Sequence, residues 1–163
     1  MSDTMQTDPR TILPEVIPNE LKARPQWVNW RLEKRGEEWT KVPYDPKTEC
    51  RASSTNPLTW ASFEEAFEAL DASGYDGVGF VFCTGDPYVG IDLDGCRDPE
   101  TGQLQAWAEK AVRNLDGYAE VSPSDTGVHV IVRGEVPRGS ASRRGPVEVY
   151  DSKRFFTMTG RAL

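Results

Sequence analysis

Apolar and polar positions divide the chain into a polar beginning and a longer part with regular patterns. Residues 1–18 are polar, contain three prolines and have no apolar period, so we expect a flexible N-terminal tail. Residues 19–24 have the composition of one short helical turn that ends before Pro25. We expect residues 19–163 to form a single domain.

Two segments rich in aromatic and β-branched residues, 27–32 and 39–44, flank a polar turn at 34–38. Strands are enriched in these residue types, so the arrangement predicts a β-hairpin. The following residues, 45–58, are rich in turn formers. They are expected to form a loop, which is a candidate cover for a site.

Two other segments carry apolar residues at helical spacing. The first follows the capping-box pair Ser62 and Glu65 and ends at a stop signal at 73–74, and we interpret its aromatic residues as core. The second, 103–115, has the apolar stripe of an amphipathic helix. The apolar positions are Phe63, Ala66, Phe67 and Leu70 in the first helix and Leu104, Trp107, Ala108, Ala111 and Leu115 in the second.

Short apolar runs in the rest of the chain predict strands. The runs 78–83 and 88–93 are separated by a turn at 84–87, so we expect them to pair with each other. Strands separated by helices indicate an α+β fold with a mostly antiparallel sheet. Further strands are predicted at 118–121, 128–133 and 147–150, with 154–159 extending the sheet.

Length and composition agree with one soluble domain. The chain has 163 residues, and 37% of them are hydrophobic, which is enough to build a core. It has no apolar run of about 18 residues and no N-terminal pattern of a signal peptide. We therefore expect a cytoplasmic protein without a membrane partner.

Charge and cysteine content exclude some classes of protein. The net charge of −7 argues against a protein that coats nucleic acid through bulk charge. The charge is uneven, because residues 1–130 contain 12 Lys and Arg against 23 Asp and Glu, whereas 131–163 contain 7 against 3. Three widely spaced cysteines and a single histidine indicate neither a disulfide framework nor a Cys/His zinc site, so we interpret the cysteines as plain thiols.

Asp92 and Asp94 lie two residues apart at the end of the predicted strand 88–93. Side chains alternate between the two faces of a strand, so both carboxylates point the same way. Two close carboxylates repel each other unless a cation lies between them, and such oxygen ligands suit Mg²⁺ or Mn²⁺. The alternative is an acidic strand end and turn without a metal.

A hydroxyl-rich loop leads into the strand that carries the only histidine. The glycine turn and the hydroxyl groups of this loop are a candidate cradle for phosphate oxygens. His129 either donates a hydrogen bond to a phosphate or is a core histidine satisfied by a backbone carbonyl. The candidate phosphate-binding residues are Ser122, Ser124, Thr126, Gly127 and His129.

Glu148 lies between two valines in the predicted strand 147–150. A glutamate in the middle of a short strand either faces the solvent or has a cation partner. Lys153, Arg154 and Arg161 follow closely and offer positive charge. The sequence leaves both interpretations open.

Taken together, these motifs resemble those of the archaeo-eukaryotic primase superfamily, and most of all the primase-polymerase domains of phages, plasmids and other mobile elements. The motifs are W-V-x-W and K-V-P-Y, then G-V-G-F-V-F, I-D-L-D, S-x-S-x-T-G-x-H and E-V-Y, followed by R-F-F-T-x-T-G. They extend from Trp27 to Gly160, which is about four-fifths of the chain.

The resemblance implies a two-lobed primase fold with an RNA-recognition-like catalytic sheet flanked by helices. It implies template-directed transfer of nucleotides from dNTPs or NTPs to a primer 3′-hydroxyl in DNA replication. Asp92, Asp94 and Glu148 would then hold catalytic Mg²⁺ or Mn²⁺, and His129 would contact the phosphates of the incoming nucleotide. The implied partners are a DNA template and primer, and an accessory helical domain or helicase in a longer replication protein.

Further residues are candidates for contacts with the nucleotide or the template. Lys153 and Arg154 carry the charge that a triphosphate requires, although solvated turn charges are the alternative. Tyr150 shares a strand face with Glu148 and is a candidate contact for the sugar, with packing as the alternative. Lys41 and residues 143–144 are candidates for contact with the template or primer backbone.

Two other functions use part of the same pattern. A catalytically silent nucleotide- or nucleic-acid-binding module of a replication initiator would share the fold, but the presence of Asp92, Asp94 and Glu148 argues against it. A metal-dependent glycosyltransferase also uses a D-x-D motif. That function leaves the loop before His129 and the presence of Glu148 between two valines unexplained.

Overall fold

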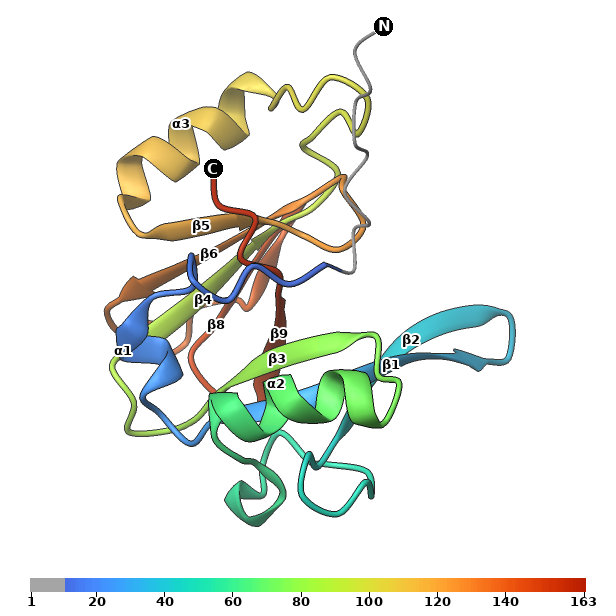
Figure 1. Ribbon diagram of the computed structural model, residues 1–163. Coiled ribbons are helices and arrows are strands. Elements are labelled where there is room, and N and C mark those ends of the chain that lie inside the picture. The colour runs from blue at the N-terminus through green and yellow to red at the C-terminus, as the bar shows by residue number, and fades with distance from the viewer. Residues whose placement is uncertain (1–10) are drawn as a thin grey trace, which may run out of the picture.

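Two antiparallel β-sheets and the helices beside them make up the computed structural model, which describes residues 11–163 (Figure 1). Its elements are α1 (Asn19–Lys22), β1 (Trp27–Arg35), β2 (Glu38–Tyr44), a short 3-10 helix η1 (Pro57–Thr59), α2 (Phe63–Ala72), β3 (Gly77–Phe82), β4 (Tyr88–Leu93), α3 (Ala106–Leu115), β5 (Tyr118–Val121), β6 (Val128–Arg133), β7 (Arg143–Arg144), β8 (Val147–Tyr150) and β9 (Arg154–Met158). One sheet has the strand order β2-β1-β3-β9, and the other has the order β5-β6-β4-β8-β7. The predicted α+β class with antiparallel pairing is confirmed.

The predicted hairpin is present and is longer than the sequence pattern indicated. Strands β1 and β2 stay paired up to Arg35 and Glu38, so that the turn consists of Gly36 and Glu37. Gly36 has a φ of 64°, a conformation that glycine adopts without steric cost. The end of this hairpin projects away from the rest of the molecule (Figure 1).

Both predicted helices form, and each buries a narrower face than expected. The capping box of α2 is complete, because the Ser62 hydroxyl accepts from the Glu65 amide and the Glu65 carboxylate accepts from the Ser62 amide. Phe63 is buried against the four-stranded sheet, whereas Phe67 keeps 38% of its surface exposed. In the second helix Ala108 is the buried residue, and α3 lies on the outer face of the five-stranded sheet (Figure 1).

The prediction that 78–83 pairs with 88–93 is wrong. Strand β3 pairs with β1 and β9 in one sheet, and β4 pairs with β6 and β8 in the other. The connection is fixed by the Asp86 carboxylate, which accepts hydrogen bonds from the amides of Cys83 and Tyr88. An apolar run shows that a strand is buried, but it does not identify the neighbouring strand. The strand predicted at 154–159 forms as β9. For the same reason, however, it does not extend the sheet of 118–121, 128–133 and 147–150, and it joins β3 in the other sheet.

The prediction of a flexible tail at 1–18 is wrong for the residues that the structure describes, and its first ten residues lie outside that range. Ile17 is buried in the core between the two sheets. The amide of Leu13 donates to the carbonyl of Thr159 at 2.9 Å. An irregular segment shows no apolar period even when single side chains fill the core, which is why the pattern did not reveal this packing.

Two remaining predictions concern the thiols and the membrane. Cys50, Cys83 and Cys96 are free, as predicted. Within residues 11–163, every helix is too short or too polar to cross a lipid bilayer.

Gly160 is the glycine that packing restricts most, which leads to a stability prediction. It has a φ of 74°, and a Cβ atom added there would lie 2.2 Å from the Leu13 carbonyl oxygen. We expect Gly160→Ala to lower the free energy of unfolding by about 3 kcal/mol or more, because backbone strain and a steric clash add. Gly36→Ala is the matched control. Gly36 has a φ of 64°, but a Cβ atom added there would meet no other atom within 4 Å, so we expect a loss of only about 1 kcal/mol in the free energy of unfolding. If Gly160→Ala and Gly36→Ala lower the free energy of unfolding, measured in urea, by the same amount, this account is contradicted.

Candidate functional site

Four ionisable side chains form a row across the five-stranded sheet. The register pairs Glu120 of β5 with His129 of β6, His129 with Asp92 of β4, and Asp92 with Glu148 of β8. Residues directly opposite each other in an antiparallel sheet project from the same face. The four side chains therefore lie on one face of the sheet. They come from three separate parts of the sequence, which are β4, the consecutive strands β5 and β6, and β8.

A pocket of about 360 Å³ lies over the middle of this row. Strand β9, the edge strand of the four-stranded sheet next to β3 (Figure 1), supplies one of its walls. The volume lies within the range typical of small-molecule sites. The pocket is lined by Asp92, His129, Glu148 and Tyr150 from the five-stranded sheet, Lys41 and Pro43 from β2, Ser54 from the loop 45–58 that follows β2, and Lys153, Arg154, Phe155, Phe156 and Thr157 around β9.

Asp92 carries the most perturbed carboxyl group of the pocket. Burial, together with the negative charges of Asp94 and Glu148, raises its pKa to about 7. Lys41 and Arg154 oppose this rise. Asp94 lies just beyond the end of β4, where its amide donates to the Pro146 carbonyl at 2.9 Å. A cation beside these carboxylates would relieve the repulsion between them.

Glu148 is buried and has cation partners, so the solvent-facing alternative is wrong. Its two carboxylate oxygens lie 3.3 Å from the Arg143 guanidinium and 3.5 Å from the Arg154 guanidinium. The Tyr150 hydroxyl also donates to Glu148. Arg154 lies over the Tyr150 ring, with its guanidinium carbon 4.6 Å from the ring centroid. The role of residues 143–144 as backbone contacts stays a prediction, and in this structure Arg143 pairs with a pocket carboxylate.

His129 is bound to a backbone carbonyl, as the core interpretation predicted, and it also lines the pocket, while its contact with a phosphate stays a prediction. Its Nδ1 lies 3.1 Å from the carbonyl oxygen of Thr157, and its ring stacks on Phe156 at 4.7 Å between centroids. Its Nε2 lines the pocket and lies 3.5 Å from the Asp92 carboxylate. Burial lowers the pKa of the imidazole and favours its neutral form. Because a carbonyl only accepts, Nδ1 carries the proton of the neutral ring and Nε2 has a free lone pair.

The hydroxyl-rich loop lies apart from the pocket lining. The Ser122 hydroxyl accepts from the Gly127 amide at 3.2 Å, and the three hydroxyls of the loop contact each other at 2.9 and 3.0 Å. The loop is anchored through Asp125, whose carboxylate lies 2.6 Å from Arg161 and 3.7 Å from Arg97. These groups satisfy each other in this structure, so a phosphate contact stays a prediction for Ser122, Ser124, Thr126 and Gly127.

Three of the predicted cationic side chains, Lys41, Lys153 and Arg154, line the pocket. The carboxylates of Asp92 and Asp94 raise the pKa of Lys41, although burial lowers it by more. Lys153 lies in the turn before β9, and its carbonyl accepts from the Ser54 hydroxyl at 3.1 Å. The loop 45–58 thus contributes Ser54 to the pocket lining, and its role as a cover stays a prediction.

Glu120 is the residue of the row that sequence reasoning missed. It is 1% exposed, and its carboxylate accepts from the amides of Thr159 and Gly160 at 2.8 and 2.9 Å and from the Tyr118 hydroxyl at 2.8 Å. Burial raises its pKa. The signal was available, because Glu120, like Glu148, is a glutamate inside a short apolar strand.

The donor chemistry of the site fits a hard divalent cation. Asp92, Asp94 and Glu148 supply carboxylate oxygens, and the raised pKa of Asp92 reflects its burial first and the negative charges of Asp94 and Glu148 second. Within residues 11–163, however, no three His, Cys, Asp or Glu side chains are already gathered around one point. In this structure the Glu148 carboxylate pairs with Arg143 and Arg154.

Comparison with known proteins gives one informative relative. No family model matches the chain. The chain is similar to the DNA Primase-polymerase of Nitratiruptor phage NrS-1, with 39% identity over 143 residues. The match covers 85% of this chain and 19% of the phage protein, so the chain spans about a fifth of the length of that relative.

Proposed function

We propose that this chain is a catalytic domain of a DNA primase-polymerase, a nucleotidyltransferase that extends a primer on a DNA template with dNTPs or NTPs. The observation that carries the proposal is the row of Asp92, His129 and Glu148 beneath a pocket with cationic walls. The similarity to the phage protein supports it at the level of a domain. An accessory helical domain or helicase stays a prediction of the sequence resemblance.

The proposal extends to the fold and the domain boundaries. We assign the four-stranded sheet to one lobe of a primase fold, and the five-stranded sheet to its RNA-recognition-like catalytic lobe. In this assignment the active site lies where the lobes meet, which agrees with a pocket lined from both sheets. The catalytic domain then includes residues 19–163, together with the packed segment 11–18.

The carboxylates are assigned to the binding of Mg²⁺ or Mn²⁺. Asp92 and Asp94 would hold the ion, and Glu148 would join them after exchanging its arginine partners. A divalent cation bound there lowers the pKa of the attacking hydroxyl and neutralises charge on the phosphates. Arg143 and Arg154, released from Glu148, would then be free to face the triphosphate.

The remaining pocket residues are assigned to substrate binding. Lys41, Lys153 and Arg154 provide positive charge along the walls for the triphosphate or the template. A phosphate oxygen accepts a hydrogen bond from His129 only when Nε2 carries a proton, so nucleotide binding would favour protonation at that atom. Tyr150 would approach the sugar from the strand that carries Glu148, and the hydroxyl loop would contact phosphates after its internal hydrogen bonds rearrange.

A primer-extension assay tests this proposal. The chain is mixed with a labelled primer on a longer DNA template, with dNTPs or NTPs, and with Mn²⁺, Mg²⁺ or a chelator. We expect extension that depends on the template and on the divalent cation. A folded chain that binds triphosphates but never extends a primer would instead be a non-catalytic binding module. Transfer of sugar from a nucleotide diphosphate sugar would favour the glycosyltransferase.

His129→Ala separates a substrate contact from a purely structural role. We expect the KM for the triphosphate to rise by about 10-fold or more, because a hydrogen bond to a charged group is lost. The melting temperature, measured by circular dichroism, is expected to fall, because the buried ring and its bond to the Thr157 carbonyl are lost, but the variant should stay folded at the assay temperature. Unfolding of this variant would show that the core requires His129, and His129→Gln would then test the nucleotide contact in a folded protein.

A further inference from the structure

The two faces of the β1–β2 hairpin differ in charge. The register pairs Leu32 with Lys41 and Lys34 with Trp39, and these side chains share one face. Between residues 30 and 43 this face carries no carboxylate. We call Leu32, Lys34, Trp39 and Lys41 the hairpin platform.

The opposite face neutralises its own charges. Glu33 lies 3.1 Å from the Arg51 guanidinium and accepts from the Tyr44 hydroxyl. Arg31 lies over the rings of Tyr44 and Tyr75, at 5.0 and 4.5 Å from their centroids. The acidic residues of the hairpin strands are therefore directed away from the platform.

The platform is open to the solvent although it contains large apolar groups. Trp39 keeps 63% of its surface exposed, and Leu32 keeps 45%. Lys34, opposite Trp39, is also exposed. An exposed tryptophan between lysines, on a face without carboxylates, is the combination on which bases stack and phosphates are neutralised.

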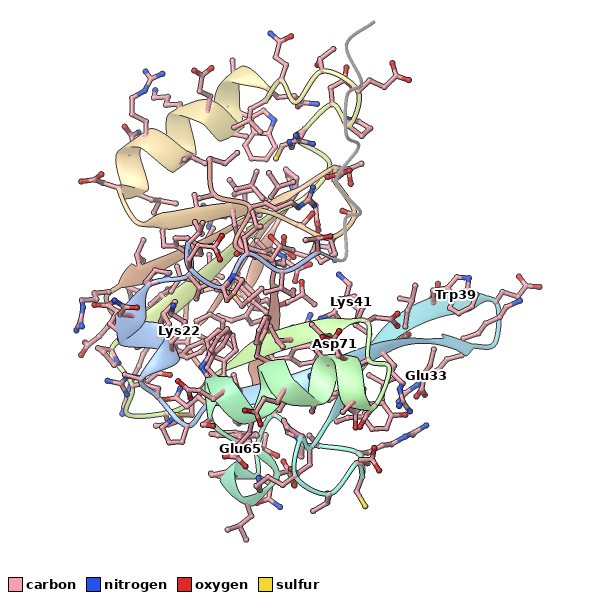
Figure 2. The ribbon with its side chains drawn as sticks, in the orientation of Figure 1. Lys22, Glu33, Trp39, Lys41, Glu65 and Asp71 are labelled. Atoms are coloured by element: carbon pink, nitrogen blue, oxygen red, sulfur yellow. The ribbon has the colours of Figure 1, made fainter. Side chains whose placement is uncertain are left out.

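The platform is continuous with the pocket. Lys41 lines the pocket, and Trp39 precedes it by two residues in the same strand, or about 7 Å. Figure 2 shows Lys41 and Trp39 on the side of the hairpin that faces the five-stranded sheet, whereas Glu33 lies on the other side. A chain of nucleotides that leaves the pocket past Lys41 would meet Trp39 within about two nucleotide spacings.

We propose that the hairpin platform binds single-stranded template DNA next to the pocket. A base stacks on Trp39, Leu32 contacts the same base edge, and Lys34 and Lys41 neutralise phosphates. This inference rests on the proposed function, since it gives that site its template path. The positive charge of Lys34 and Lys41 complements the phosphates of nucleic acid, whereas two copies of this chain, each with a net charge of −7, repel each other.

Binding of a fluorescein-labelled oligothymidylate to the full chain, measured by anisotropy at several salt concentrations, tests the platform. We expect Trp39→Ala to weaken binding by about 5- to 100-fold and Trp39→Phe to retain most of it. Lys34→Ala is expected to reduce the slope of log affinity against log salt by about 0.7, whereas Trp39→Ala leaves the slope unchanged.

Two matched variants control for effects that do not involve the platform. Trp107→Ala removes another exposed tryptophan, on α3, and Arg35→Ala removes a cation from the opposite face of the same hairpin. Both are expected to bind the oligonucleotide as wild type does. Equal binding by wild type and Trp39→Ala, or the absence of oligonucleotide binding by wild type, would overturn the platform.

Triphosphate binding, measured by calorimetry with Mn²⁺, distinguishes failure of the platform from failure of the proposed function. We expect Trp39→Ala to bind the triphosphate as wild type does. If wild type binds oligonucleotide through Trp39 but binds no triphosphate, the platform is supported as a DNA site and the proposed function fails. Loss of triphosphate binding in Trp39→Ala would overturn the platform, because Trp39 would then belong to the pocket.

Discussion

Asp92→Asn is expected to lower the rate of primer extension by at least about a thousandfold while leaving the protein as stable as wild type or more stable. The amide keeps the shape of the side chain but cannot hold a divalent cation with a negative charge, which removes the main electrostatic contribution to the transfer step. The same change removes a partly buried charge that Asp94 and Glu148 destabilise. A gain in stability with loss of activity is typical of functional sites.

The pH dependence of stability provides a second readout for this variant. The pKa of Asp92 is raised from 3.8 in the unfolded chain to about 7 in the folded protein. Between these values the folded state holds a proton that the unfolded state has released, so stability falls as pH rises. The melting temperature of Asp92→Asn, relative to wild type, should therefore increase from pH 4 to pH 7. Asp71→Asn, on the exposed side of α2, should show no such trend, and extension by Asp92→Asn within tenfold of wild type would contradict the assignment.

Glu120→Ala is expected to lower the free energy of unfolding by about 3 to 5 kcal/mol. The substitution leaves the amides of Thr159 and Gly160 and the hydroxyl of Tyr118 without their acceptor in the core. Each buried donor that loses its partner costs about 1 to 3 kcal/mol. Urea unfolding of wild type and variant measures the difference.

Two further variants define what Glu120 contributes. The free energy of unfolding of Glu120→Gln is expected to lie between those of wild type and Glu120→Ala. The glutamine keeps one carbonyl oxygen as an acceptor but turns its NH₂ group toward a donor. Glu68→Ala, on the exposed face of α2, should change stability by less than about 0.5 kcal/mol. A cost of under 1 kcal/mol for Glu120→Ala would mean that the segment 159–160 does not depend on this carboxylate.

Local features of the fold could be predicted because they are encoded by neighbouring residues. The capping box at Ser62 and Glu65 fixes where α2 begins, and the turn at Gly36 fixes the hairpin. The strands at 118–121, 128–133 and 147–150 have the predicted limits. In each case the pattern of a few consecutive residues determines the local conformation.

Contacts between distant segments could not be predicted from the same patterns. Strand β3 is apolar throughout and fits equally well beside β4 or beside β1, and the choice depends on side chains that pack between the sheets. The buried position of Ile17 depends on a gap in the core that no local pattern describes. Assignment of such pairs requires tertiary information.

The candidate site shows the same division. The order of motifs indicated that Asp92, His129 and Glu148 belong together, and the register of β4, β6 and β8 brings them together. The pairing of Glu148 with Arg143 and Arg154 was not evident, because it depends on how the chain returns after β7 and into β9.

Calorimetric titration of wild type with a dNTP in the presence and absence of Mn²⁺, beside the double variant Asp92→Asn/Asp94→Asn, tests the central claim most directly. We expect binding by wild type that requires the cation, and a loss of affinity of at least about 100-fold in the double variant, which should remain folded. Binding of equal strength by both proteins, or no binding by a folded wild type, would contradict the assignment of Asp92 and Asp94 to a nucleotidyl-transfer site.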